Sequence, residues 1–257
     1  MKLLEFPHSH YCEKARWALD YKGVPFQAVA LLPGLHMITV RKYAPDKSVP
    51  VLLSDGEGVQ GSSEIIDYLD RKFPLHSLTP VDPDRRQACL EIERSMDTRL
   101  GENIRRVLYD RLLAYPEFIR HCFTHPMPGV KQFIFRLFYP VLRNKIYQTY
   151  VVSPAKVEHS RREFDVAMSE LEQVIKQGQY LVGDQFTRAD LSVASMLSLL
   201  VMPTEHPFPW RDIPDPQTRL FYDAYRDHPV SEWVRKMYRE HRLRKGPNSG
   251  YGVTASN

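Results

Sequence analysis

The sequence contains few cysteines, and their number excludes several classes of protein. Its 257 residues include three, namely Cys12, Cys89 and Cys122. An odd number at wide spacing argues against a disulfide scaffold, and the lack of clustered ligands around them argues against a zinc site. We therefore expect no bound metal, and we expect a reducing compartment, the cytoplasm, as the location of the protein.

Long apolar runs and a strong net charge are also missing. The most apolar window, residues 191–201, has about half of the ~20 residues that a membrane-spanning helix needs, and Arg188 and Asp190 flank it. The apolar stretch in residues 1–7 is too short for a secretory signal. The excess of basic over acidic residues is only 35 − 31 = +4. We therefore expect neither a membrane nor a nucleic acid as a partner.

The composition is that of an ordinary globular protein, with 43% hydrophobic and 26% charged residues. At roughly 150 residues per domain, the length predicts about 1.7 domains, which means two domains or one large one. The first 75 residues alternate between strand and helix patterns in the order β-α-β-α-β-β-α, which predicts a mixed sheet with helices on both faces. The predicted strands are 2–6, 26–32, 49–53 and 58–60, and the predicted helices are 11–21, 36–43 and 62–73.

The pattern changes at a segment with three prolines, and beyond it only helical periodicity is found. We therefore predict an α/β domain at 1–75, a linker at 76–83, an all-helical domain at 84–245, and a small, polar tail at 246–257 that we expect to be disordered. The predicted helices of the second domain are 84–113, 130–150, 154–177, 187–202, 216–227 and 229–243.

The segment that joins the first predicted strand to the first predicted helix carries reactive side chains. Ser9 and Cys12 have the spacing of a C-x-x-C redox motif in which serine replaces the first cysteine. A hydroxyl cannot become an attacking thiolate, but it can donate a hydrogen bond to the thiolate of a bound molecule. The helix N-terminus would stabilise that anion by roughly 0.3–2 kcal/mol. The alternative is structural, because serine is also a good helix cap.

Two later segments have features of a binding site. Pro50 opens a predicted interior strand, where it removes a hydrogen-bond donor. A cis Val49–Pro50 bond would explain this and would expose the main chain of Val49 to a peptide-like ligand, although most such bonds are trans. Ser62 and Ser63 begin a predicted helix and form a small anion-binding concavity, or they serve only as caps.

Five segments together resemble the glutathione transferase superfamily, in particular its soluble members with a serine-type active site. The first four occur in the order and at the separations of the family's N-terminal domain. In the fifth, Thr187 and Asp190 are spaced like a capping box before an apolar helix, with aspartate in place of glutamate. The segments are Ser9-x-x-Cys12 with residues 13–19, then residues 22–26, 48–52, 62–69 and 183–190.

The resemblance implies a thioredoxin-like domain, an all-helical domain, and glutathione bound between them as co-substrate. Ser9 would stabilise the glutathione thiolate, and Val49, followed by a cis Pro50, would pair with the cysteinyl main chain. Ser62, with Ser63 beside it, matches the serine that holds the γ-glutamyl carboxylate. The family usually has Glu or Gln before that serine, whereas this chain has Gly61; Gln60 or Glu64 would have to replace it.

The function implied is therefore a glutathione transferase of the detoxification type, a homodimer that joins glutathione to a small electrophilic or hydrophobic ligand. Tyr11 could donate to the thiolate in place of Ser9. Cys12 lies in the first turn of the predicted helix, where its pKa should fall, yet it also lies on the apolar stripe and would then pack inward. The alternatives are a ligand-binding protein without turnover and a glutathione-dependent thiol-disulfide reductase that uses Cys12.

Overall fold

The computed structural model describes residues 1–242, which begin with a four-stranded sheet. The strands are β1 (Lys2–Glu5), β2 (Gln27–Ala30), β3 (Val51–Ser54) and β4 (Glu57–Gln60), in the order β2-β1-β3-β4. β1 pairs in parallel with β2 and antiparallel with β3, and β3 pairs antiparallel with β4. The predicted mixed sheet is confirmed.

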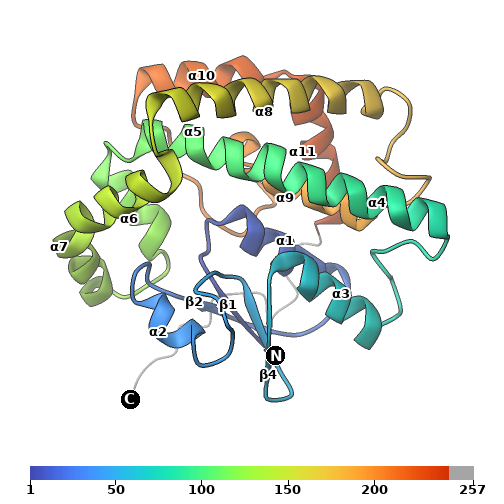
Figure 1. Cartoon of the computed structure of the whole chain (residues 1–257), viewed down its shortest axis with the longest axis horizontal. Coiled ribbons are helices and arrows are strands. Elements are labelled where there is room, and N and C mark those ends of the chain that lie inside the picture. Colours follow the sequence, from blue (N-terminus) through green and yellow to red (C-terminus); the bar gives the residue numbers. More distant parts are fainter. Residues whose placement is uncertain (243–257) are drawn as a thin grey trace.

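Three helices cover the two faces of this sheet, namely α1 (His10–Tyr21), α2 (His36–Val40) and α3 (Ser62–Lys72). Successive side chains of a strand point to opposite faces, so Leu3 joins the core around α1 and α3 while Leu4 packs with Val40 of α2. Figure 1 shows that α1 and α3 lie between the sheet and the helices of the second half. The βαβαββα thioredoxin-like order predicted for the first part is therefore confirmed.

The second half is helical, as predicted, and it differs from the prediction in two places. The long helix expected at 84–113 is interrupted by a π-helical turn, η1 (Asp97–Glu102), and a second such turn, η2 (Tyr147–Val151), follows helix α7 (Gly129–Ile146). Helix α6 was not predicted, because the prolines around it favour a loop in sequence. Pro116 instead occupies the first turn of α6, where its fixed φ is tolerated. The elements are α4 (Pro83–Met96), η1 (Asp97–Glu102), α5 (Asn103–Leu112), α6 (Pro116–Thr124), α7 (Gly129–Ile146), η2 (Tyr147–Val151), α8 (Pro154–Ile175), α9 (Arg188–Val201), α10 (Pro216–Arg226) and α11 (Pro229–His241).

Helix α9 is the central helix of this half, and almost all of its residues are buried. Its start has the predicted capping pair: the Asp190 carboxylate accepts hydrogen bonds from the main-chain N–H and the hydroxyl of Thr187, both at 2.8 Å. The most apolar window of the sequence is thus a core helix. Within residues 1–242, no helix is both long and apolar enough to cross a membrane. The predicted tail, 246–257, lies outside the described residues.

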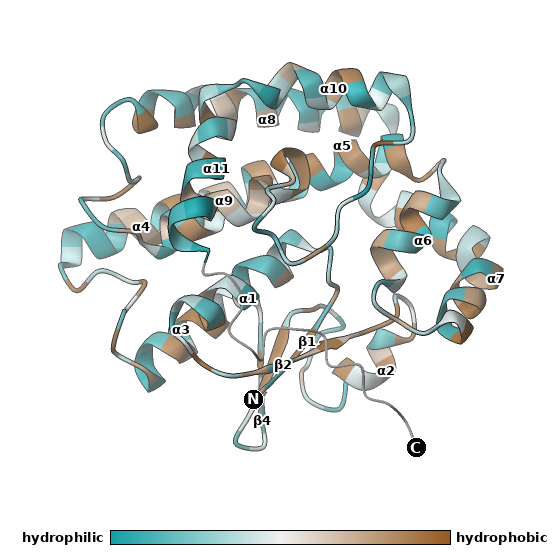
Figure 2. Ribbon diagram, turned by 180° about the vertical axis from the view of Figure 1, so that it is seen from behind, coloured by the Kyte–Doolittle hydropathy of each residue, from teal (hydrophilic) through white to brown (hydrophobic). Residues whose placement is uncertain are grey.

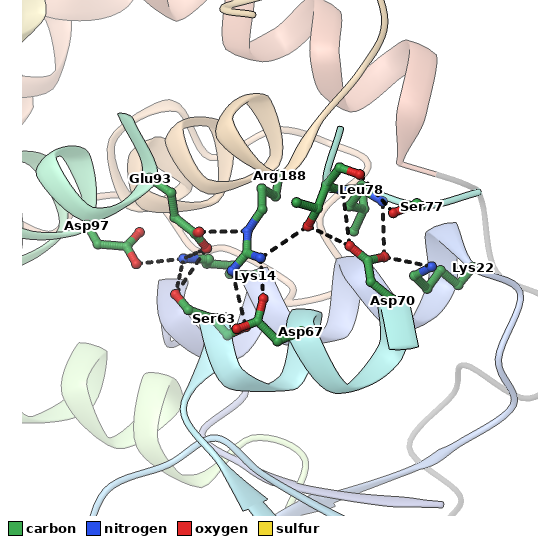
Figure 3. A network of polar contacts seen from close by, with 11 residues as sticks. Lys14, Lys22, Ser63, Asp67, Asp70, Ser77, Leu78, Glu93, Asp97 and Arg188 are labelled. Atoms are coloured by element: carbon green, nitrogen blue, oxygen red, sulfur yellow. Dashed lines mark hydrogen bonds and ion pairs between the residues drawn. The ribbon is translucent and has the colours of Figure 1, made fainter. Parts of the chain in front are cut away.

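A buried polar network connects the two halves (Figure 3). The guanidinium of Arg188, on α9, pairs with Glu93 of α4 at 2.6 Å and with Asp67 of α3. The ammonium of Lys14, on α1, pairs with Glu93 at 2.7 Å and with Asp97 of η1 at 2.6 Å. Helices α1 and α3 are therefore held against α4, η1 and α9, which sets the position of the loop before α1.

Candidate active site

A cavity of about 790 Å³ lies between the two halves, where β1 ends and α1 begins. Ser9, Tyr11 and Val49 contribute to its wall from the α/β half. The opposite wall is largely apolar and aromatic. Its residues from the helical half include Leu108, Tyr109, Phe118, Phe123, Trp210 and Tyr222. Among the predicted site residues, the cavity brings together Ser9, Tyr11 and Val49.

Ser9 occupies the N-cap position of α1, but its side chain does not cap the helix. The main-chain oxygen of Ser9 accepts the N–H of Glu13 at 2.8 Å, and the hydroxyl makes no capping hydrogen bond to any described residue of the helix. The hydroxyl instead interacts with the thiol of Cys12. Ser9 thus lies in the cavity wall beside the positive end of a helix dipole.

Cys12 is fully buried behind Ser9, and its sulfur accepts the N–H of Phe6 at 3.5 Å. Burial raises the pKa of its thiol to about 12, although the hydrogen bonds from Phe6 and Ser9 oppose the shift. This is opposite to the direction expected from its place at a helix N-terminus. Desolvation outweighs the helix dipole because the sulfur lies on the packed side of α1. Burial likewise raises the pKa of Cys89, and that of Cys122 to about 12.

The hydroxyl of Tyr11 is already engaged. It donates a hydrogen bond to the main-chain oxygen of Asp97 in η1 at 2.7 Å, and burial raises its pKa. The ring of Tyr11 lines the cavity, with the guanidinium carbon of Arg105 5.7 Å from its centroid. Tyr11 therefore contributes a ring to the wall, while its hydroxyl links α1 to the helical half.

Val49 presents unused main-chain groups at the cavity. The Val49–Pro50 peptide bond is cis, and Pro50 is buried beneath the wall with its oxygen accepting the N–H of Gly61 at 3.0 Å. Across residues 1–242, neither the N–H nor the C=O of Val49 has a hydrogen-bond partner. A peptide-like ligand would find one donor and one acceptor at this position.

The other predicted binding residues lie outside the cavity wall. The Gln60 amide donates to the main-chain oxygen of Ser48 at 2.8 Å and accepts the N–H of Asp46 at 3.1 Å, so it holds the loop before β3. Ser63 accepts from Lys14 and donates to Glu93, both at 3.0 Å, within the network of Figure 3. Ser62 is buried at the start of α3.

Gly61 has a backbone conformation that suits glycine, with φ +101° and ψ 141°. A Cβ atom added there would lie 2.0 Å from the carboxylate oxygen Oε2 of Glu64. The carboxylate of Glu64 therefore occupies the space that a side chain at position 61 would need. Of the two replacements considered from sequence, Glu64 is the one that reaches this place.

Two further polar residues, His8 and Arg105, lie in the cavity wall, and neither was assigned to the binding site from the sequence. His8 packs against Phe123, with 4.5 Å between ring centroids, and burial lowers its pKa to about 4, so the imidazole is neutral at pH 7. The guanidinium of Arg105 stacks over the Tyr150 ring at 4.5 Å, and its buried Nε has no hydrogen-bond partner in the described chain. In sequence, Arg105 and Arg106 are typical of a solvated helix face. Among residues 1–242, no group of histidine, cysteine and carboxylate side chains could hold a metal ion.

Comparison with known proteins identifies the family. The family models of the glutathione S-transferase N-terminal and C-terminal domains match residues 3–80 and 154–224, which together make up more than half of the chain. The chain belongs to the glutathione transferase superfamily. Residues 81–153, which include α6 and α7, lie between the two matched regions.

Curated relatives of this superfamily member carry different activities. A maleylpyruvate isomerase from Ralstonia sp. is 31% identical over 118 residues, which are 45% of this chain and 54% of that protein. A glutathione S-transferase from Pseudomonas putida F1 is 24% identical over 191 residues, which are 74% of this chain and 70% of that protein. The first of these alignments spans only about half of the relative's length.

The fold also matches solved structures along its whole length. A glutathione S-transferase from Methylobacterium radiotolerans JCM 2831, solved in complex with glutathione sulfonate, superposes with a TM-score of 0.63 at 22% identity. The superposition covers 100% of this chain and 97% of the other. The thioredoxin-like domain followed by an all-helical domain is therefore the shared architecture.

Proposed function

We propose that the protein is a glutathione transferase in which Ser9 stabilises the glutathione thiolate for attack on an electrophilic carbon. The observation that supports this most is the position of Ser9, at a helix N-terminus in the cavity wall. Its hydroxyl makes no capping bond within the described residues and interacts with the thiol of Cys12, which is a weak acceptor. Val49 lies on the same wall, and its main-chain groups, which have no hydrogen-bond partner among residues 1–242, are suited to the cysteinyl part of glutathione.

The energies are sufficient for this role. A free thiol has a pKa near 8.5, so only a few per cent is thiolate at neutral pH. Lowering that pKa by about 2 units requires roughly 2.7 kcal/mol of preference for the anion. One hydrogen bond from a hydroxyl to a charged group contributes about 1.5–3 kcal/mol, and the helix N-terminus adds roughly 0.3–1 kcal/mol.

Cys12 and Tyr11 are weaker candidates for the same step. A buried thiol with a pKa of about 12 is neither a nucleophile nor a redox centre at neutral pH, which disfavours the thiol-disulfide reductase. The Tyr11 hydroxyl donates its proton to a strong acceptor, the main-chain oxygen of Asp97, at 2.7 Å. The Ser9 hydroxyl is bonded to the Cys12 thiol, a weak acceptor, and would turn from it to a bound thiolate. Binding of the γ-glutamyl end by Gln60, Ser62 and Ser63 stays a prediction, as do the homodimer and the cytoplasmic location.

The electrophile would lie against the aromatic wall of the helical half. That wall is apolar except for a few groups, of which Arg105 is half-buried and has no ion-pair partner among residues 1–242. An unpaired cation in a partly desolvated wall favours an anionic group on the ligand. We therefore propose an apolar electrophile that carries a carboxylate or a similar anion. A transferase and an isomerase among the relatives are both compatible with a first step in which thiolate adds to carbon.

Kinetics of Ser9→Ala test the assignment, with Cys12→Ala as the matched control. Each variant and the wild type are assayed with an aryl halide and with a mixed glutathione disulfide, and glutathione binding is measured by calorimetry. Loss of one charge-assisted hydrogen bond predicts a fall in kcat/KM for the aryl halide of about 10- to 150-fold in Ser9→Ala. The control should keep the wild-type value.

Three results would contradict the proposal. If Ser9→Ala transfers the aryl group as fast as the wild type, the serine does not stabilise the thiolate. If the wild type reduces the mixed disulfide and Cys12→Ala does not, the protein is a thiol-disulfide reductase that uses Cys12. Wild-type protein that binds glutathione but turns over neither substrate supports a ligand-binding protein without catalysis.

A further inference from the structure

Helix α7 carries an exposed apolar stripe, which we call the α7 stripe and define as Val130, Phe133, Leu137, Phe138 and Val141. Each of these side chains is between 60% and 72% exposed. Scattered exposed apolar residues are normal, but five large ones on one helix form a patch of the kind that marks an interaction surface. The stripe lies in the region between the two family-model matches.

The stripe points away from the body of the protein. On the opposite side of α7, Phe135, Tyr139 and Ile146 are buried, and the Tyr139 hydroxyl donates to the main-chain oxygen of Leu113 at 2.7 Å. A turn of about 100° per residue places Phe133 and Leu137 on the far side from these anchors. Figures 1 and 2 show α7 at the outer edge of the helical half, with apolar segments along it.

The charges of α7 are all of one sign. The helix contains Lys131, Arg136, Arg143 and Lys145 and has no acidic residue between Gly129 and Ile146. At about 100° per residue, Lys145 falls within the stripe, between Val141 and Phe138, and Lys131 falls beside Phe138. Arg136 and Arg143 fall beyond Phe133, toward the buried side of the helix. All four are exposed, although Arg143 also donates to the main-chain oxygen of Leu113 and Lys145 also lines the cavity.

An exposed apolar stripe on a helix that carries four cations and no acidic residue is complementary to the surface of an anionic lipid bilayer. Phenylalanine and leucine enter the boundary between headgroups and acyl chains, while lysine and arginine extend to the phosphates. A second copy of this chain fits the same surface poorly, because a two-fold contact through α7 would bring Lys131 and Lys145 close to the same cations of the copy, with no acidic residue of α7 to pair with them.

We propose that α7 binds the surface of membranes that contain anionic lipids, with its axis in the membrane plane. The sequence led us to expect no membrane partner, but that expectation rested on the lack of a spanning segment. Interfacial binding needs no such segment, and within residues 1–242 none exists. The inference does not depend on the proposed function.

Vesicle flotation with the full-length protein tests the proposal. The wild type is mixed with phosphatidylcholine vesicles, with and without phosphatidylglycerol, at low and at high salt. We expect binding to the anionic vesicles that weakens at high salt. Phe133→Ser combined with Leu137→Ser should lower the affinity at least 10-fold. Lys131→Gln combined with Arg136→Gln should lower it about 5-fold for each charge removed, since each contributes about 1 kcal/mol near the surface.

Leu220→Ser is the matched control, because Leu220 is an equally exposed leucine, at 62%, on α10. Circular dichroism and thermal melting verify that every variant is folded. The proposal is overturned if the wild type does not float with anionic vesicles at low salt, or if the stripe variant binds as well as the control. A wild-type dimer in sedimentation analysis that the Phe133 and Leu137 substitutions dissociate, without vesicle binding, would assign the stripe to a second copy instead.

Discussion

Replacing Arg188 by methionine tests how strongly the buried network holds the two halves together. Methionine keeps an unbranched side chain and removes the charge. The substitution deletes the contact to Glu93 at 2.6 Å, the ion pair with Asp67, and hydrogen bonds to the Thr79 hydroxyl at 3.1 Å and the Ser63 main-chain oxygen at 3.2 Å. The loss in the free energy of unfolding depends on the carboxylates that remain without this partner.

The largest part of the loss comes from the Glu93 carboxylate, because its side chain is only 4% exposed and cannot be hydrated in place of the ion pair. Breaking a buried ion pair from one side costs about 3–5 kcal/mol. Glu93 keeps Lys14 at 2.7 Å, and Asp67 is 48% exposed and can be hydrated. We therefore expect the lower end, a loss of about 3 kcal/mol in the free energy of unfolding at pH 7.

The loss should depend on pH. Burial works to raise the pKa of Glu93, but Lys14 and Arg188 outweigh it and hold the pKa below its ordinary value. In the wild type, this carboxylate stabilises the fold above its unfolded pKa, and the contribution disappears as the pH falls through the folded pKa. Without Arg188 the pKa of Glu93 in the folded protein rises, so Glu93 is protonated at a higher pH and its buried charge no longer destabilises the variant. The difference between wild type and Arg188→Met is then largest at pH 7 and shrinks on acidification below about pH 5.

Urea unfolding followed by circular dichroism at several pH values measures this difference. Arg85→Met is the control, because the pair of Arg85 with Asp184 at 3.0 Å has side chains that are 55% and 77% exposed. Exposed pairs contribute about 0–1 kcal/mol, so this variant should unfold almost like the wild type. A loss below about 1 kcal/mol for Arg188→Met at pH 7, or a difference that grows on acidification, would refute the reasoning.

Three further predictions follow from the site. Because burial raises the pKa of Cys12 and Cys122 to about 12, iodoacetamide at pH 8 should modify the native protein much more slowly than the urea-unfolded protein, as followed by mass spectrometry; equal rates would contradict the burial. Gly61→Ala should lower the free energy of unfolding by about 1–3 kcal/mol, because φ is +101° and the new Cβ meets Glu64. Gly23→Ala, at φ +64° with open space around it, should lower it less, and a larger loss in Gly23→Ala would contradict this account. Arg105→Gln should lower kcat/KM for an electrophile with a free carboxylate about 10-fold or more while leaving its methyl ester unchanged; equal effects on acid and ester would exclude a charge-specific role.

The secondary structure was largely predictable because its signals are local. The strand and helix patterns of β1 and α1 and the capping pair at the start of α9 each depend on residues close together in the sequence. The same holds for β3 and β4, because the two residues between them, Asp55 and Gly56, are a pair typical of a tight hairpin turn, and both have positive φ. Helix α6 was missed because prolines near a short segment favour a loop, and only packing shows that Pro116 begins a helix. The η1 turn has no local signal in sequence.

The candidate site was predictable only in part, for the same reason. By itself, the sequence determined the fold class, the family resemblance, and the place of Ser9 and Val49, because each follows from a short motif. The tertiary structure decided what each group faces. It brings the Tyr11 hydroxyl within hydrogen-bond distance of the main-chain oxygen of Asp97, 86 positions away, and it places Arg105 on the cavity wall. It also reversed the expected pKa shift of Cys12. Desolvation and contacts between distant elements arise only when helices pack, so no local pattern contains them.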